Sequence, residues 1–133
     1  MRVIIVTSLA AIALSACSSD RTIRAEFNQS LEQYNESIRW QDLDKAGLFS
    51  SPSISEKFKA RAEIAKKARI TDYRILDVKY DEKAQKAVAT VIFDYYMLTS
   101  ATVKKVTDTQ KWVYAGEGAA KSWKLLSLPP EFP

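Results

Sequence analysis

The sequence predicts an α+β domain in which N-terminal helices pack on a curved, four-stranded antiparallel sheet. Two observations carry this prediction. Up to about residue 69, apolar side chains recur at helical spacing. From Ile70 onward, the chain is rich in Val, Ile, Tyr, Thr and Trp and is divided by short turns. Helices that precede a run of antiparallel strands typically pack on one face of the sheet. A chain of 133 residues suits one such domain.

The first predicted helix covers about residues 20–40, with Asp20 as its N-cap. Its apolar stripe advances in steps of four, four, three and four residues: Ile23, Phe27, Leu31, Tyr34 and Ile38. Polar residues are expected on the opposite, solvent-facing side: Arg24, Glu26, Gln29, Glu32, Asn35 and Glu36. This pattern predicts a helix that packs on the sheet along one side.

A turn and a short helix are expected over residues 40–49, and Gly47 and Pro52 end this segment. Ser53 and Glu56 have the spacing of a capping box, which predicts a third helix up to about residue 68. This helix carries a basic cluster: Lys57, Lys59, Arg61, Lys66, Lys67 and Arg69. Such a cluster is typical of a solvated helix face, and contact with an anionic headgroup or glycan is the alternative.

Four strands are expected, over residues 70–80, 85–98, 102–115 and 121–128. In the first strand the apolar residues change parity near Ile75, which predicts a β-bulge there. Pro129 and Pro130 end the last strand, because proline cannot donate a backbone hydrogen bond.

The second strand indicates which face of the sheet is buried. One parity has no charged residue and is predicted to face the helices: Ala87, Ala89, Val91, Phe93, Tyr95 and Met97. The other parity is also mostly apolar and is predicted to form a partner face: Val88, Thr90, Ile92, Asp94, Tyr96 and Leu98. The alternative is that the C-terminal tail, residues 129–133, folds over this row.

The N-terminus has the layout of an exported protein. Met1 and Arg2 precede an apolar run from Val3 to Leu14, which is short for a membrane span of about 20 residues. Leu14-Ser15-Ala16-Cys17 then resembles the lipobox of bacterial lipoproteins. This resemblance implies a signal peptide over residues 1–16, cleavage between Ala16 and Cys17, and a diacylglyceryl group on the Cys17 thiol. Residues 17–20 would then be the tether. Serine after the cysteine resembles the outer-membrane sorting pattern, facing the periplasm; a host with one membrane would hold the protein in its cell membrane.

Residues 21–128 resemble the NTF2-like superfamily, in which a cone-shaped sheet wraps a long N-terminal helix. The resemblance is carried by Phe27, Tyr34 and Ile38, by the segment Trp40-Gln41-Asp42-Leu43-Asp44-Lys45-Ala46, and by two late segments, Gln110-Lys111-Trp112-Val113-Tyr114 and Ser122-Trp123-Lys124-Leu125. It implies a cone interior in which relatives with activity use Asp, Tyr or His. Here four aromatic residues are predicted to line that interior, either as a pocket or as plain core: Tyr34, Tyr95, Trp112 and Trp123.

The chain has no His, and its one Cys is assigned to lipid, so Ser-His, Cys-His and His-metal chemistries are excluded. The remaining acid-base candidates are Asp77, Asp94, Tyr95, Tyr96 and Asp108. The parity of the second strand turns Asp94 away from any interior pocket. No catalytic constellation, metal site or cofactor is therefore predicted. Loss of Arg2 with the signal lowers the net charge from +4 to +3, too little to indicate nucleic-acid binding.

These observations favour a lipid-anchored, non-catalytic binding or scaffold domain, an accessory subunit of a cell-envelope assembly. It would act as a homodimer or with an envelope protein partner. The alternatives are a carrier of a small apolar ligand in the cone and a small isomerase or dehydratase. A filled interior would favour the first reading, an open apolar pocket the second, and an inward carboxylate in a deep pocket the third.

Overall fold

The computed structural model describes the backbone of residues 16–133 and the side chains from residue 22 onward. The predicted signal peptide and the lipid-attachment side chain of Cys17 therefore lie outside the described part. The elements follow in this order: α1 (Ala16–Arg39), α2 (Leu43–Gly47), α3 (Ser55–Ala65), β1 (Ala68–Asp81), β2 (Lys86–Met97), β3 (Lys104–Ala115), the 3₁₀ turn η1 (Gly118–Ala120) and β4 (Ser122–Leu125). None of the described helices is long and apolar enough to cross a membrane.

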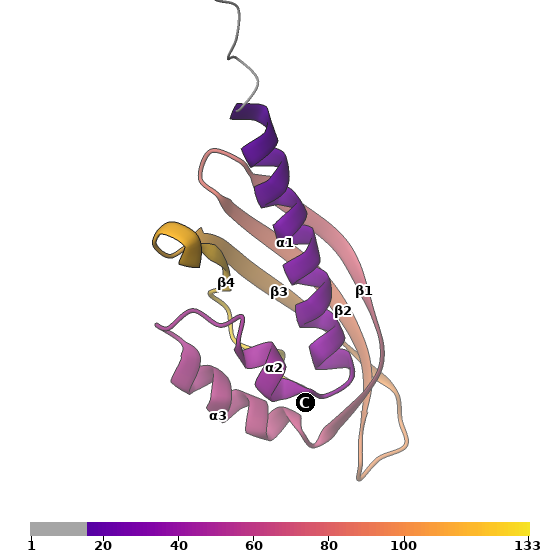
Figure 1. Ribbon diagram of the computed structural model, residues 1–133. Coiled ribbons are helices and arrows are strands. Elements are labelled where there is room, and N and C mark those ends of the chain that lie inside the picture. Colours follow the sequence, from indigo (N-terminus) through magenta and orange to yellow (C-terminus); the bar gives the residue numbers. More distant parts are fainter. Residues whose placement is uncertain (1–15) are drawn as a thin grey trace, which may run out of the picture.

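The predicted α+β class is confirmed. The four strands form one antiparallel sheet in the order β1-β2-β3-β4, so each strand pairs with its neighbour in sequence. Figure 1 shows α1 lying across this open sheet, with the long hairpin of β1 and β2 curving past it and α2 and α3 beside its C-terminal end. The helices thus cover one face of the sheet, which we call the inner face.

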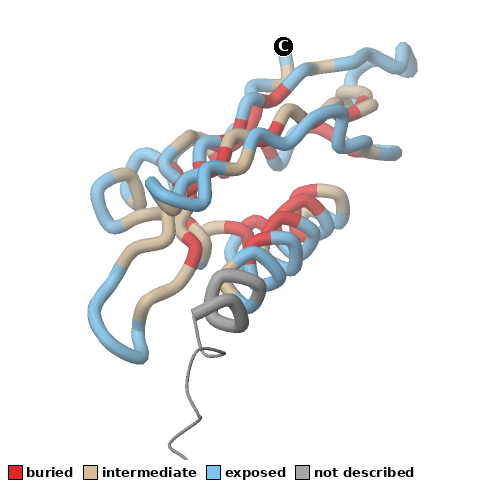
Figure 2. The backbone as a smooth tube through the Cα atoms, turned by 90° about the horizontal axis from the view of Figure 1, so that it is seen from above, coloured by how far each residue is buried: buried red, intermediate tan, exposed pale blue. Residues whose placement is uncertain are grey.

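The apolar stripe of α1 packs on the inner face as predicted. Phe27, Leu31, Tyr34 and Ile38 are all buried, and Figure 2 shows the buried residues of α1 on the side turned toward the sheet. The helix begins at Ala16, earlier than expected, and its backbone includes residues 17–20, which the sequence analysis assigned to a tether. Asn35 was wrongly placed on the solvent face, because it is fully buried.

The parity predicted for β2 is confirmed. Ala87, Ala89, Val91, Phe93 and Tyr95 are 0–3% exposed and belong to the core. The predicted bulge near Ile75 is also confirmed, because the register between β1 and β2 shifts between Ile75 and Asp77. A second shift lies between Ile70 and Asp72 and was not predicted. The two irregularities explain why the apolar residues of β1 do not follow one parity.

Two local predictions about α3 and β4 were wrong. The N-cap of α3 is Ile54, no side chain caps it, and the hydroxyl of Ser53 lies 3.0 Å from that of Ser51; the predicted capping box is not formed. The last strand is only four residues long. Beyond it, the amide of Leu126 still donates to the carbonyl of Lys111 (2.7 Å), but the chain then turns toward the inner face.

Candidate functional site

The most distinctive chemistry lies in a polar cluster buried on the inner face between α1 and β3. Asp108 pairs with Val91 and Gln110 pairs with Ala89 in the sheet register. Because paired residues of antiparallel strands share a face, both polar side chains point inward with the buried row of β2. Asn35 reaches the same point from α1, and all three residues are buried.

Two amides in this polar cluster hydrogen-bond reciprocally. Gln110 Nε2 donates to Asn35 Oδ1 (2.8 Å), and Asn35 Nδ2 donates to Gln110 Oε1 (3.3 Å). Asn35 Nδ2 also donates to the carbonyl of Leu31 (2.8 Å), and Gln110 Nε2 donates to Asp108 Oδ2 (2.9 Å). The cluster therefore ties the middle of α1 to β3, since buried polar groups that lose their partners are costly.

Asp108 is the one carboxyl of the five acid-base candidates that points into the domain. Its side chain has little access to water, and burial raises its pKa to about 6, while the hydrogen bond from Gln110 acts in the opposite direction. Burial, and then the charge of Asp108, raise the pKa of Tyr34 well above its ordinary value. Within the described part of the chain, Tyr34 Oη and Trp112 Nε1 have no hydrogen-bond partner. The pKa of Asp108 is thus raised by burial beside a tyrosine whose pKa is also raised, so that its phenol stays protonated at neutral pH.

The other acid-base candidates lie elsewhere. Asp94 points to the outer face and forms an ion pair with Lys105 (2.9 Å). Asp77 is exposed on β1, and Tyr96 is half-buried in the outward row of β2. Tyr95 is buried, and its hydroxyl donates to the carbonyl of Pro133 (2.7 Å). The structure therefore does not bring these candidates together with Asp108.

The C-terminal tail fills the inner face at the end where β2 meets β3. The ring of Phe132 lies 5.0 Å from that of Tyr95 and 6.3 Å from that of Phe93, measured between centroids. Arg61 on α3 holds the tail through an ion pair with Glu131 (3.0 Å). Pro129 and Pro130 are buried. The alternative that the tail covers the outward row of β2 is thus wrong, since it packs on the opposite face.

The four aromatic residues predicted for the interior are all on the inner face. Tyr34, Tyr95, Trp112 and Trp123 are 0–2% exposed and pack against other side chains. Tyr34 lies edge-on to Trp112 (5.6 Å between centroids), and Trp123 Nε1 donates to the carbonyl of Ile23 (2.9 Å). Tyr95 instead contacts the C-terminal tail. They act as core rather than as the walls of an open pocket.

The outward row of β2 is only partly shielded. Val88, Thr90, Ile92, Asp94 and Tyr96 are half-buried, and Leu98 is 62% exposed. All the helices of residues 16–133 lie on the inner face (Figure 1), so within this part of the chain the row is shielded by its neighbours in the sheet and by no helix. The predicted partner face is therefore present at the surface as a mostly apolar row.

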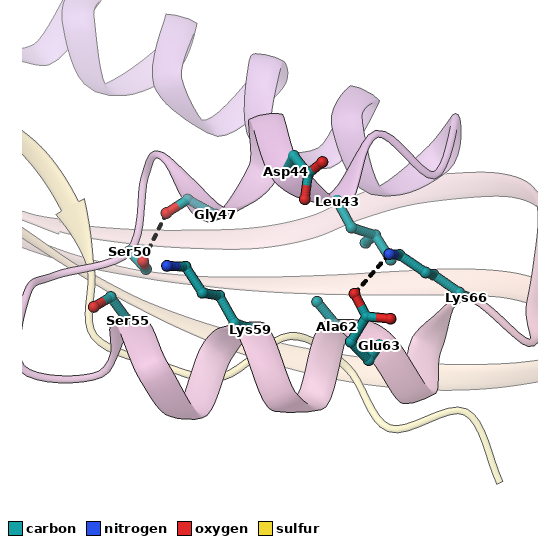
Figure 3. Close-up of a pocket in the computed structure, with 9 residues that line it drawn as sticks. All are labelled: Leu43, Asp44, Gly47, Ser50, Ser55, Lys59, Ala62, Glu63 and Lys66. Carbon is teal, nitrogen blue, oxygen red and sulfur yellow. Dashed lines mark hydrogen bonds and ion pairs between the residues drawn. The ribbon is translucent and has the colours of Figure 1, made fainter.

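A small cavity of about 180 Å³ lies between α2 and α3 (Figure 3). Its charged lining is mixed, with Lys59 and Lys66 against Asp44 and Glu63, and Lys66 Nζ lies 2.6 Å from a Glu63 carboxylate oxygen. Lys59 also approaches Glu56 (3.8 Å). The basic cluster of the sequence analysis is thus partly neutralised by its own acidic neighbours, as in a solvated helix face.

The sequence pointed to Asp108 as a candidate but not to Gln110, its hydrogen-bond partner, nor to Asn35, which bonds to Gln110. One signal was available on β3, where Val106, Asp108, Gln110 and Trp112 alternate with exposed residues. Two polar residues in the same row as a tryptophan indicate a buried polar cluster. Among the described residues, no group of three or more acidic or cysteine side chains could hold a metal ion.

Comparisons with known proteins bear on the fold. No protein-family model matches the chain, and no curated protein matches it. Several solved structures do match. Among them are a SEC-C motif containing protein from Rhodopseudomonas palustris (TM-score 0.55, 9% identity, 70% of this chain and 69% of that chain covered) and a SEC-C motif containing protein from Psychrobacter arcticus (TM-score 0.55, 11% identity, 94% of this chain and 67% of that chain covered). At this identity the likeness shows a shared α+β fold alone: helices packed on an open, four-stranded antiparallel sheet.

Proposed function

We propose that this chain is a lipid-anchored lipoprotein whose domain binds a partner protein of the cell envelope and does not catalyse a reaction. The single observation that carries the binding role is the contrast between the two faces of the sheet. The inner face is filled by α1, by the aromatic core and by the C-terminal tail, whereas the outward row of β2 is mostly apolar and lies under none of the described helices. An apolar surface of this kind is a typical interaction site.

The anchoring part of the proposal rests on Leu14-Ser15-Ala16-Cys17. Two or three acyl chains on Cys17 would hold the protein on the membrane, because each buried methylene contributes about 0.8 kcal/mol. Because Ser18 follows Cys17, the proposed location is the outer membrane, facing the periplasm. The helix that starts at Ala16 would leave the domain close to the lipid surface, since a helix advances only about 1.5 Å per residue.

We further propose that the domain belongs with the NTF2-like superfamily. A long N-terminal helix lies on the concave side of an antiparallel sheet, as the resemblance implies. A filled inner face argues against the carrier role. Asp108, an inward carboxyl whose pKa is raised to about 6, is the observation that favours a small isomerase or dehydratase instead. Because Asp108 is buried, substrate access to its carboxyl would require part of the inner face to open.

Ile92→Lys tests the binding role. Ile92 is half-buried, so its contribution to association is about 1–2 kcal/mol, or roughly a 5- to 30-fold loss of affinity on substitution. The assembly is measured by sedimentation of the purified protein and by co-purification with envelope proteins. Ile64→Lys, at an exposed position on α3, is the matched control and should leave assembly unchanged. A parent protein that stays monomeric and captures no envelope partner would contradict the proposal.

A further inference from the structure

β1 is an open edge of the sheet. It pairs only with β2, and residues 74–79 are all exposed. The opposite edge is covered, because the amide of Leu125 in β4 donates to the carbonyl of Phe49 (2.7 Å) and the amide of Ser51 donates back to Leu125 (2.8 Å). An uncovered edge strand offers unpaired backbone groups to another strand. In the described part of the chain, β1 is therefore the edge that is available for pairing.

The centre of this edge is apolar. Ile75 is 42% exposed, Leu76 is 55% exposed and Val78 is 37% exposed, which makes a short run of large hydrophobic side chains in contact with water. The register shift between Ile75 and Asp77 places Leu76 in the bulge. Side chains of this kind gain free energy when a second strand covers them.

The charges of β1 on the outer face form an alternating row. Asp72, Arg74, Asp77 and Lys79 pair with Asp94, Ile92, Thr90 and Val88, so they share the face of the outward row of β2. Their signs run minus, plus, minus, plus along the strand. None of Arg74, Asp77 and Lys79 has an ion-pair partner among residues 22–133. When two copies of this row are placed side by side in antiparallel orientation, each charge therefore lies opposite a charge of the other sign.

We propose that β1 pairs in antiparallel orientation with β1 of a second copy of this chain, about a twofold axis between Ile75 and Leu76. In this register Arg74 of one copy lies opposite Asp77 of the other, and Asp72 lies opposite Lys79. Tyr73 then lies opposite Val78, so inner-face side chains also meet inner-face side chains. Every charge in the row meets one opposite charge of the other copy, and each of the two pairs occurs twice, once on each side of the axis, as an isologous interface requires.

The start of β1 limits the length of the pairing. Arg39 Nη1 donates to the carbonyl of Ile70 (2.5 Å), and the side-chain amide of Gln41 donates to the carbonyl of Ala68. The open segment therefore runs over residues 72–79. An interface of this length is smaller than a standard stable one, so pairing depends on confinement of both copies to a membrane. In this respect it rests on the lipid anchor of the proposed function.

A zero-length carbodiimide cross-link between Lys79 and Asp72 tests the register in membranes of cells that express the full chain. Within one chain these two residues are about 23 Å apart along the same strand, too far for an amide bond to join them. A Lys79–Asp72 cross-linked peptide, identified by mass spectrometry of the dimer band, can therefore come only from two copies. Incorporation of a radioactive fatty acid tests the anchor separately.

Charge reversal supplies the control. Arg74→Asp should lower the yield of cross-linked dimer roughly tenfold, because it places like charges opposite each other at two symmetric positions. The double variant Arg74→Asp/Asp77→Arg should restore the yield, and Lys83→Asp, in the turn beyond β1, should not change it. Absence of the cross-link in the parent protein would overturn the proposal. So would a dimer that Ile92→Lys abolishes and Arg74→Asp does not, an outcome that would still support the proposed function through the outer face.

Discussion

Asp108→Asn should remove a pH-dependent loss of stability that the buried carboxyl imposes on the fold. Asparagine has nearly the same shape, and its side-chain oxygen can still accept the hydrogen bond from Gln110 Nε2, which is 2.9 Å long in the parent protein. The substitution therefore removes the charge while it keeps the cluster with Asn35. This separates the cost of the charge from the cost of a lost partner.

Stability should fall as the pH rises, because the pKa of Asp108 is higher in the folded protein than in the unfolded chain. Burial raises the pKa of Asp108 to about 6 in the folded protein, against about 3.9 in an unfolded chain. Below pH 4 the carboxyl is protonated in both states, so its full contribution to stability is present there. As the pH rises through 6, the folded state must hold a buried charge and this contribution is lost. Two pKa units correspond to roughly 3 kcal/mol of unfolding free energy.

Urea denaturation at pH 4, 5, 6 and 7 measures the effect. The difference in unfolding free energy between Asp108→Asn and the parent protein should grow by roughly 3 kcal/mol from pH 4 to pH 7, a change of about 1–3 M in the urea midpoint. Glu117→Gln, at an exposed loop position, is the control and should show a difference that does not vary with pH. Parallel pH profiles for Asp108→Asn and the parent would refute the reasoning and would place Asp108 in contact with water.

Three further predictions concern the core, the tail and the anchor. Phe93→Ala should cost roughly 3–5 kcal/mol by thermal or urea denaturation, because Phe93 is fully buried between Tyr73 and Phe132; an unchanged melting temperature would contradict the assigned face. Phe132→Ala should raise the binding of a hydrophobic dye, since the tail then leaves the inner face, whereas Glu131→Gln should cost under about 1 kcal/mol because that carboxylate is exposed. Cys17→Ala should abolish labelling by a radioactive fatty acid and release the protein from membranes; equal labelling in mutant and parent would exclude the lipoprotein assignment.

Much of the fold was predictable because it follows local periodicity. The helical spacing of Phe27, Leu31, Tyr34 and Ile38 determines which side of α1 is buried, whatever the partner. The period of two in β2 likewise determines its inward row, from Ala87 to Tyr95, because neighbouring side chains of a strand point to opposite faces. Even the bulge near Ile75 could be predicted, since the apolar residues change parity there.

The candidate site could not be predicted in the same way. Asn35 lies beside the apolar stripe of α1, and only its contact with Gln110, 75 residues away, makes burial favourable. Nothing local distinguishes it from Glu32 or Glu36. The raised pKa of Asp108 likewise follows from its burial on the inner face, which depends on packing between distant elements and not on its neighbours in sequence.

By itself, the sequence determined the class of the fold, the order of its elements and the buried faces of α1 and β2, because these depend on spacing within single elements. Only the tertiary structure decided that the tail fills the inner face, where Phe132 reaches Tyr95. It also decided that β1 is left as the uncovered edge while the segment around Ser50 covers β4. These features arise from contacts between residues that are distant in the chain. They are determined by the packing energy of the whole layer, and a local sequence pattern does not reveal them.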